Sequence, residues 1–294
     1  MGKTVLLILL VLLLIIYAEG KRELGFFKIT RYSLCVPKFH LLDNEKKIIL
    51  LADLHDKVYG KENKELLEKV RREKPDLILI AGDMIVGREN PSFEVALNFI
   101  TKLPDICPVY YALGNHEQRL KEEPLKYGDS GYSDYKKALQ KSGVCFLENE
   151  TAEFMLDRLC VRVSGLELPI WTYKKFKKHQ VDTRDISRCI GRSKPEKYNL
   201  LLAHNPVFFP AYKEWGADLT LSGHLHGGII RIPGLGGFIT PQAVLFPSYS
   251  GEMTQDGNQA IVVSRGLGTH TINLRFCNNA EVVVINLCPF KNSY

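Results

Sequence analysis

Five stretches of this 294-residue sequence share one form, an apolar run that ends in a polar turn: IILLADLH at 48–55, LILIAGD at 77–83, VYYALGNHE at 109–117, LLLAHNP at 200–206 and LTLSGHLHG at 219–227. Short apolar runs of this kind predict strands that are buried on both faces of a sheet. Helical patterns at 61–72 and 91–103 separate the first three runs, which indicates right-handed crossovers between parallel strands. Such crossovers place the C-terminal strand ends on one edge, so we expect the five polar turns to share one site.

The remaining pattern predicts a helix at 135–142 and shorter strands at 144–149, 154–156, 160–164 and 282–287. The composition is 45% hydrophobic and 24% charged, which is enough to bury a substantial core and excludes a disordered chain. We therefore expect one α/β domain over residues 46–294, with two packed mixed sheets and helices outside. Residues 21–45 are interpreted as a juxtamembrane segment.

The N-terminus has an unbroken apolar run at residues 5–18, followed by the charged sequence EGKR at 19–22. An uncleaved membrane anchor, a cleaved secretory signal and a buried core segment are the three alternatives. The anchor is favoured because the run has no polar face and no clear small-x-small cleavage site. At about 1.5 Å per residue the run covers only about two thirds of a bilayer core, so flanking lysines would have to snorkel.

We expect residues 1–20 to hold the protein at the cell membrane as a single-pass anchor. Basic residues are more frequent after the run than before it, which favours a cytoplasmic domain, but the side of the membrane stays open. The net charge of +6 is mild, and no nucleic-acid partner is expected. The seven scattered cysteines indicate neither a disulfide framework nor a zinc ribbon. A basic and aromatic segment, YKKFKKH at 173–179, has two interpretations: a solvated surface, or a contact with anionic lipid head groups or substrate.

The polar turns carry the candidate chemistry: Asp53, His55, Asp83, Asn115, His116, His204, His224 and His226. Imidazoles and carboxylates without thiolates form a ligand set for Mn, Fe or Zn, and the number of ligands fits two ions better than one. With one carboxylate shared between two divalent ions, the centre keeps a net positive charge that attracts phosphate. Any one motif alone is more often a capped turn or a core pair, whereas five at successive strand ends indicate a site.

The order D-x-H, G-D, G-N-H-E, H and G-H-x-H resembles the calcineurin-like metallophosphoesterase superfamily over residues 47–288. The resemblance implies a four-layer α/β/β/α sandwich. It implies a first metal ion on Asp53, His55 and His226, a bridging Asp83, and a second ion on Asn115, His204 and His224. His116 would be the catalytic residue, which either protonates the departing oxygen or steadies the transferring phosphoryl group. Asn115 and His116 would both contact substrate.

Two features refine the resemblance. The residues after Asp83, MIVGR at 84–88, bring no carboxylate to orient His116, which counts against a phosphoserine phosphatase. The sequences SRGLGT at 264–269 and LRF at 274–276 resemble a membrane-associated phosphodiesterase branch. Some members of that branch cleave the pyrophosphate of UDP-2,3-diacylglucosamine.

The resulting hypothesis is a two-metal hydrolase of a phosphodiester or pyrophosphate bond, with a lipid-linked or nucleotide-sugar substrate. A phosphomonoesterase or nuclease using the same site is one alternative. A catalytically inactive, metal-binding membrane scaffold is the other.

Overall fold

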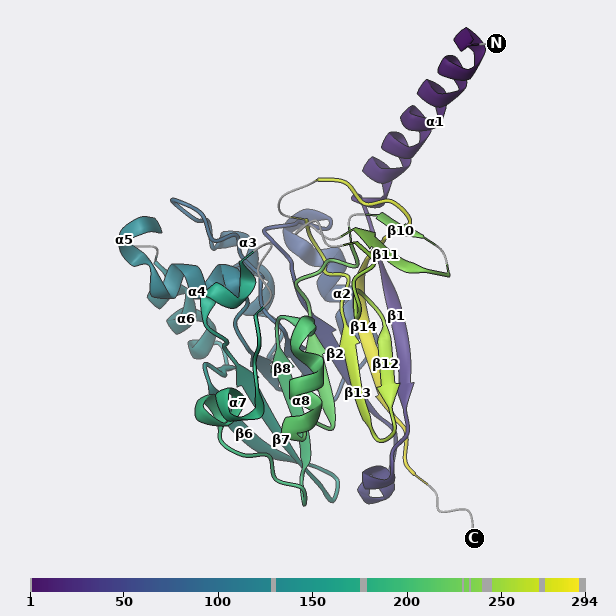
Figure 1. Ribbon diagram of the computed structural model, residues 1–294. Helices are drawn as coiled ribbons and strands as arrows, with labels where there is room; N and C mark the ends of the chain where they lie inside the picture. Colours follow the sequence, from purple (N-terminus) through teal and green to yellow (C-terminus); the bar gives the residue numbers. More distant parts are fainter. Residues whose placement is uncertain are drawn as a thin grey trace.

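Two six-stranded sheets form the centre of the computed structural model, which describes residues 2–127, 131–174, 179–228, 230–232, 234–239, 245–269 and 273–290 (Figure 1). The first sheet has the order β1 (Phe27–Leu34), β14 (Ala280–Leu287), β2 (Lys46–Leu51), β3 (Leu77–Ile80), β4 (Val109–Tyr111) and β5 (Val144–Phe146). The second has the order β12 (Met253–Asp256), β13 (Gln259–Val263), β9 (Leu219–Ser222), β8 (Tyr198–Ala203), β7 (Leu159–Leu166) and β6 (Glu150–Leu156). Strands β2 to β5 are mutually parallel, as are β7, β8, β9 and β13.

The apolar runs supply both faces of each sheet because successive side chains of a strand point in opposite directions. On β2, Ile48 and Leu50 lie in the core between the sheets, together with Leu202 of β8. Ile49 instead faces the outer core of the first sheet, and Leu201 faces the outer core of the second. This alternation explains why the run at 48–52 contains no polar position.

Helices cover the two outer faces. The first sheet is covered by α2 (Lys64–Arg72), α3 (Glu94–Ile100) and α6 (Tyr132–Lys141), which contribute Leu66, Phe99 and Leu139 to its outer core. The second is covered by α7 (Thr183–Ile190) and α8 (Phe209–Trp215). Helices α4 (Asn115–Glu122) and α5 (Pro124–Tyr127) follow β4, and short 3-10 helices occupy Pro37–Leu41, Lys61–Asn63, Ile170–Tyr173 and Pro206–Phe208. The expected α/β sandwich of two mixed sheets is confirmed.

The folded sheet begins N-terminal to the expected start at residue 46. Strand β1 lies inside the segment interpreted as juxtamembrane, and it pairs in parallel with β14 along its whole length. Leu34, Val36 and Phe39 are buried in the core between the sheets. The strand is at the edge of the sheet and several of its side chains are only partly buried, so its sequence lacks the apolar run that marks the central strands.

Helix α1 (Gly2–Glu23) projects away from the domain (Figure 1). Its length and composition are sufficient to cross a membrane, although a signal sequence would meet the same test. None of its apolar window is buried in the protein, which argues against a core segment. At about 1.5 Å per residue its 22 residues extend about 33 Å, comparable with a bilayer core. A two-stranded hairpin, β10 (Ile230–Ile232) with β11 (Gly236–Ile239), lies near the base of α1 (Figure 1).

Candidate metal centre

The five polar turns meet at one edge of the sandwich, which we call the catalytic edge. Asp53 follows β2, Asp83 follows β3 and Asn115 begins α4 directly after β4. From the second sheet, His204 follows β8 and His224 follows β9. Because these strands are parallel within each sheet, their C-terminal ends bring together residues that are distant in sequence.

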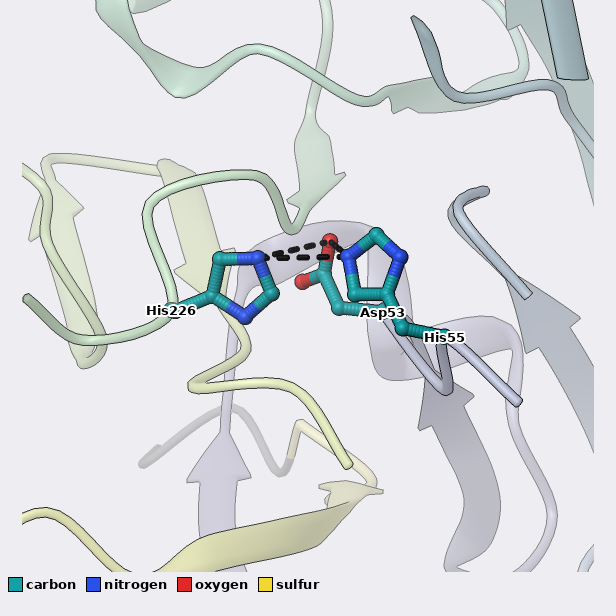
Figure 2. Close-up of side chains that lie close together, drawn as sticks. All are labelled: Asp53, His55 and His226. Carbon is teal, nitrogen blue, oxygen red and sulfur yellow. Dashed lines mark hydrogen bonds and ion pairs between the residues drawn. The ribbon is translucent and has the colours of Figure 1, made fainter. Parts of the chain in front are cut away.

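Asp53, His55 and His226 form one group of possible ligands, with ligand atoms within 4.8 Å of one another (Figure 2). The Nε2 atoms of His55 and His226 are 3.3 Å apart, and each lies 3.9 Å from Oδ1 of Asp53. These distances leave the three side chains facing a common point.

A second group consists of Asp83, His204 and His224, and a third of His55, Asp83 and His116. Oδ2 of Asp83 lies 3.1 Å from Nε2 of His204 and 3.8 Å from Nε2 of His55. Asp83 therefore stands between the two sets of histidines, a position from which one carboxylate can be shared by two ions. His116 also faces it, with Nε2 3.9 Å from the same oxygen.

Asn115 is placed at the same edge, and its Oδ1 atom is buried without a hydrogen-bond partner in the described part of the chain. A buried carbonyl oxygen without a partner is costly, so this atom is available to a metal ion or a water molecule. An amide oxygen beside carboxylates and imidazoles is a suitable donor set for divalent Mn, Fe or Zn. The residues thus fit a metal centre.

The backbone of the turns is strained in a way that the sequence does not reveal. Five candidate ligands adopt left-handed φ angles: Asp53 (52°), His55 (47°), Asp83 (55°), His224 (73°) and His226 (52°). For non-glycine residues this conformation costs roughly 1–2 kcal/mol each. The left-handed kink lets residues two positions apart face the same centre, although alternate residues of a regular strand would face opposite sides.

Glycines make the close approach possible. A β-carbon on Gly114 would lie 2.2 Å from Oδ1 of Asp83, and one on Gly223 would lie 2.6 Å from Oδ2 of Asp53. Both contacts are shorter than any tolerated by a real side chain. The glycines of the G-N-H and G-H-x-H turns are therefore required by the packing of the two aspartates.

Hydrogen bonds with backbone groups assign a tautomer to three of the histidines. Nδ1 of His204 lies 2.6 Å from the carbonyl oxygen of Ala81, and Nδ1 of His226 lies 3.2 Å from that of Gly268. A carbonyl can only accept, so these Nδ1 atoms carry hydrogen, and Nε2 of each neutral ring keeps a lone pair that faces the other candidate ligands. His116 is the opposite case, because its Nδ1 accepts a 2.8 Å hydrogen bond from the N–H of Gly87. Its neutral ring therefore carries the hydrogen on Nε2.

Burial and neighbouring charges shift the pKa values of the site residues in different directions. Burial opposes the ionisation of Asp83, but the charge of His204 and its hydrogen bond to the carboxylate hold the pKa of Asp83 well below the usual value. Burial acts to lower the pKa of His204, yet the charge and hydrogen bond of Asp83 raise it to about 9. Burial lowers the pKa of His224 to about 3 and that of His226 well below its usual value. The last two rings are thus neutral and ready to donate a lone pair.

Glu117 has a role that the sequence reasoning missed. It is fully buried, and its carboxylate accepts hydrogen bonds from the Tyr111 hydroxyl and from the N–H groups of Asp83, Met84, Ile85 and Gly114. All of these partners are donors, so the ionised form satisfies them. Glu117 thereby joins the turn that carries Asp83 to the turn that carries Asn115 and His116. The G-N-H-E motif contained the residue, but only the fold shows what it binds.

Arg275 and Asn278 were also missed. The guanidinium of Arg275 is buried and donates to the carbonyl oxygens of Arg265, Gly266, Gly268 and Asn278. The amide of Asn278 donates to the carbonyl oxygens of His226 and Gly228, while its backbone N–H donates to Glu23 of α1. The turn that carries His226 is thus connected by hydrogen bonds to the C-terminal end of α1.

The basic segment at 173–179 is described only at its ends, and residues 175–178 lie outside the described residues. The ring of Tyr173 packs edge-on against the ring of His224, with 5.0 Å between their centroids. This end of the segment therefore borders the metal centre.

Comparisons with known proteins agree with this geometry. The calcineurin-like phosphoesterase family model matches residues 46–228. The metallophosphoesterase YkuE of Bacillus subtilis is 27% identical over 247 residues, covering 82% of this chain and 78% of that protein. The phosphodiesterase YaeI of Escherichia coli is 25% identical over 276 residues, covering 90% of each. A metallophosphoesterase of Helicobacter pylori is 30% identical over 255 residues, covering 84% of this chain and 61% of that protein. With most of the fold and the polar turns inside the matched residues, the chain belongs to the calcineurin-like phosphoesterases and is a hydrolase of phosphate esters.

Proposed function

We propose that this chain is a two-metal phosphodiesterase or pyrophosphatase that acts at a membrane surface. The position of Asp83 is the observation that carries the proposal. Its carboxylate belongs to two groups of possible ligands, one with His55 and His116 and one with His204 and His224. A carboxylate in that position can serve two ions at once.

We assign Asp53, His55 and His226 to the first ion and Asn115, His204 and His224 to the second, with Asp83 shared. The tautomers of His204 and His226 support these assignments because both rings present Nε2 to the centre. When bound, two divalent ions of Mn, Fe or Zn supply positive charge for the phosphoryl oxygens and lower the pKa of a water molecule.

His116 is assigned to the substrate rather than to a metal. With Nδ1 accepting from Gly87, Nε2 carries a hydrogen and points toward the carboxylate of Asp83. Such a group donates a hydrogen bond to a phosphoryl or leaving-group oxygen and stabilises the charge that develops there. Of the two roles considered from sequence, this tautomer favours stabilising the phosphoryl group over protonating the leaving oxygen.

The membrane part of the proposal is supported by α1, which we assign as an N-terminal anchor. The relative YaeI is named a phosphodiesterase, which supports the diester over the monoester. An amphiphilic substrate held in the same bilayer would reach the site at high effective concentration. UDP-2,3-diacylglucosamine, which combines a pyrophosphate with acyl chains, is the first substrate to test.

The experiment measures turnover of three compounds by the purified full-length chain: bis-p-nitrophenyl phosphate, p-nitrophenyl phosphate and UDP-2,3-diacylglucosamine in vesicles. Mn, Zn, Fe and Mg are added in turn after removal of metal. We expect hydrolysis of the diester or the pyrophosphate to exceed that of the monoester. Faster monoester hydrolysis would favour a phosphomonoesterase, and no hydrolysis with any ion would favour an inactive scaffold.

A further inference from the structure

Exposed apolar side chains are concentrated at the catalytic edge. Outside α1, the described residues expose these large hydrophobic side chains: Val58, Leu125, Met155, Trp171, Val207, Leu235, Leu245 and Phe246. Val58 follows β2, Val207 follows β8, and Trp171 lies in the segment after β7, so each stands beyond the C-terminal end of a strand at that edge. Met155 lies at the other edge of the sandwich. It is near the C-terminal end of β6, and β6 runs antiparallel to β7.

Three of these side chains lie on or beside the β10–β11 hairpin, Leu235 at its turn and Leu245 and Phe246 beside the end of β11. Leu235 is 70% exposed between β10 and β11. Leu245 and Phe246 are more than half exposed, and they are joined to β11 by a bridge between Ile239 and Leu245 and by a hydrogen bond from Phe246 to Phe238. We call Leu235, Leu245 and Phe246 the apolar tip.

The β10–β11 hairpin, which carries the apolar tip, lies near the base of α1 (Figure 1). Strand β10 is bridged to Phe276, and the N–H of Arg231 donates to the carbonyl oxygen of that residue. Two residues later, Asn278 donates to Glu23, and Arg275 donates its backbone N–H to Gly20 of α1. Hairpin and helix end are therefore fixed to the same short segment, residues 275–278.

Exposed apolar groups of this size on a soluble surface mark an interaction site. Here the helix that is long enough to cross a bilayer leaves the domain at the same end, with Lys21 and Arg22 in its last turn. Basic residues at the end of such a helix lie at the level of the lipid head groups. A bilayer containing α1 would consequently meet the apolar tip.

We propose that the apolar tip inserts into the bilayer interface and turns the catalytic edge toward the lipid surface. The proposal rests on the membrane location given under the proposed function. It names a second contact besides α1, and it explains how the metal centre would reach a scissile bond close to the head groups. With α1 as the single contact, the domain could turn on a hinge and the catalytic edge could face water. With α1 and the apolar tip both in the bilayer, the orientation of the catalytic edge is fixed.

The test uses the full-length chain in phosphatidylcholine vesicles that contain phosphatidylglycerol. Exposed cysteines Cys35, Cys145 and Cys277 are replaced by serine, and one new cysteine carries an environment-sensitive fluorophore. The probe sites are Leu235→Cys and Leu245→Cys, and the matched control is Met155→Cys, which is similarly exposed at the far end of the domain. Quenching by brominated acyl chains and by aqueous iodide is measured in each sample.

We expect lipid quenching to be severalfold stronger at positions 235 and 245 than at 155, with iodide quenching in the reverse order. Equal lipid quenching at all three positions would overturn the proposal, as would failure of the chain to float with the vesicles. The readout does not depend on turnover. If the enzyme hydrolyses the diester but the apolar tip stays in water, the tip proposal is wrong and the phosphoesterase assignment stands. If the tip is buried in lipid but no diester is hydrolysed, the proposed function is wrong instead.

Discussion

Replacing Glu117 by Gln is the sharpest test of how the turns that carry Asp83 and Asn115 are held together. In the structure, one carboxylate oxygen accepts from Asp83 at 2.8 Å and Gly114 at 3.1 Å, and the other accepts from Met84, Ile85 and Tyr111. An amide has only one accepting oxygen. Its NH₂ group must therefore face at least two buried N–H donors.

Each buried N–H that loses its acceptor costs about 1–3 kcal/mol, so Glu117→Gln should lower the free energy of unfolding by about 2–6 kcal/mol. The glutamine amide can turn its NH₂ group toward either set of donors. The orientation that leaves fewer donors unpaired removes the acceptor of the N–H groups of Asp83 and Gly114. The turns carrying Asp83 and Asn115 should then separate. We consequently expect weaker metal binding as well as lower stability.

The assay is denaturant unfolding of metal-free protein in detergent, followed by metal titration of the folded variant. Glu122→Gln on the same helix is the matched control, because Glu122 is exposed and its replacement should change stability by no more than about 0.5 kcal/mol. The reasoning would be refuted by a Glu117→Gln variant that unfolds at the wild-type midpoint and binds two ions with wild-type affinity.

Three further outcomes are expected. His116→Gln should keep both ions and slow turnover by roughly 10² to 10⁴, the range of a lost charge stabiliser, and loss of the ions in elemental analysis would show instead that His116 is a ligand. Metal affinity should rise with pH toward about 9, because the raised pKa of His204 means that the metal-free protein holds a proton on that ring which the metal must displace. By the same linkage, protonated His204 stabilises the metal-free fold fully below about pH 6.5, and this contribution is lost as the pH rises through about 9. Calorimetry in buffers of different ionisation enthalpy measures the released proton, and an affinity independent of pH between 6 and 9 would contradict the assignment. Leu50→Ala should cost about 2–5 kcal/mol because Leu50 is fully buried between the sheets, whereas Met155→Ala at an exposed site should cost little in the same denaturant experiment.

The central strands could be predicted from sequence because burial on both faces leaves a clear apolar run. The run at 219–222 coincides with β9, and that at 77–81 with β3 to within one residue. Strand β1 could not be predicted in this way, since an edge strand has partly exposed side chains and its partner, β14, is distant in sequence. The hairpin of β10 and β11 was missed because its short strands carry no buried run.

The candidate ligands could be named from sequence because each follows an apolar run, and a parallel sheet gathers such positions. The interactions that hold these ligands in place could not be inferred from the sequence. The left-handed backbone of Asp53 and His226, the contact of Gly87 with His116 and the link from Asn278 to Glu23 all depend on the folded path of the chain. Those interactions join residues for which no sequence spacing indicates proximity.

The most direct test of the central claim is to measure metal content and diester turnover on the same purified samples of wild type and Asp83→Asn. If Asp83 serves both ions, the wild type should contain two divalent ions per chain and hydrolyse the diester, and the variant should lose metal and activity together. Two ions retained by Asp83→Asn, or a wild-type chain that is active with a single ion, would contradict the two-metal account.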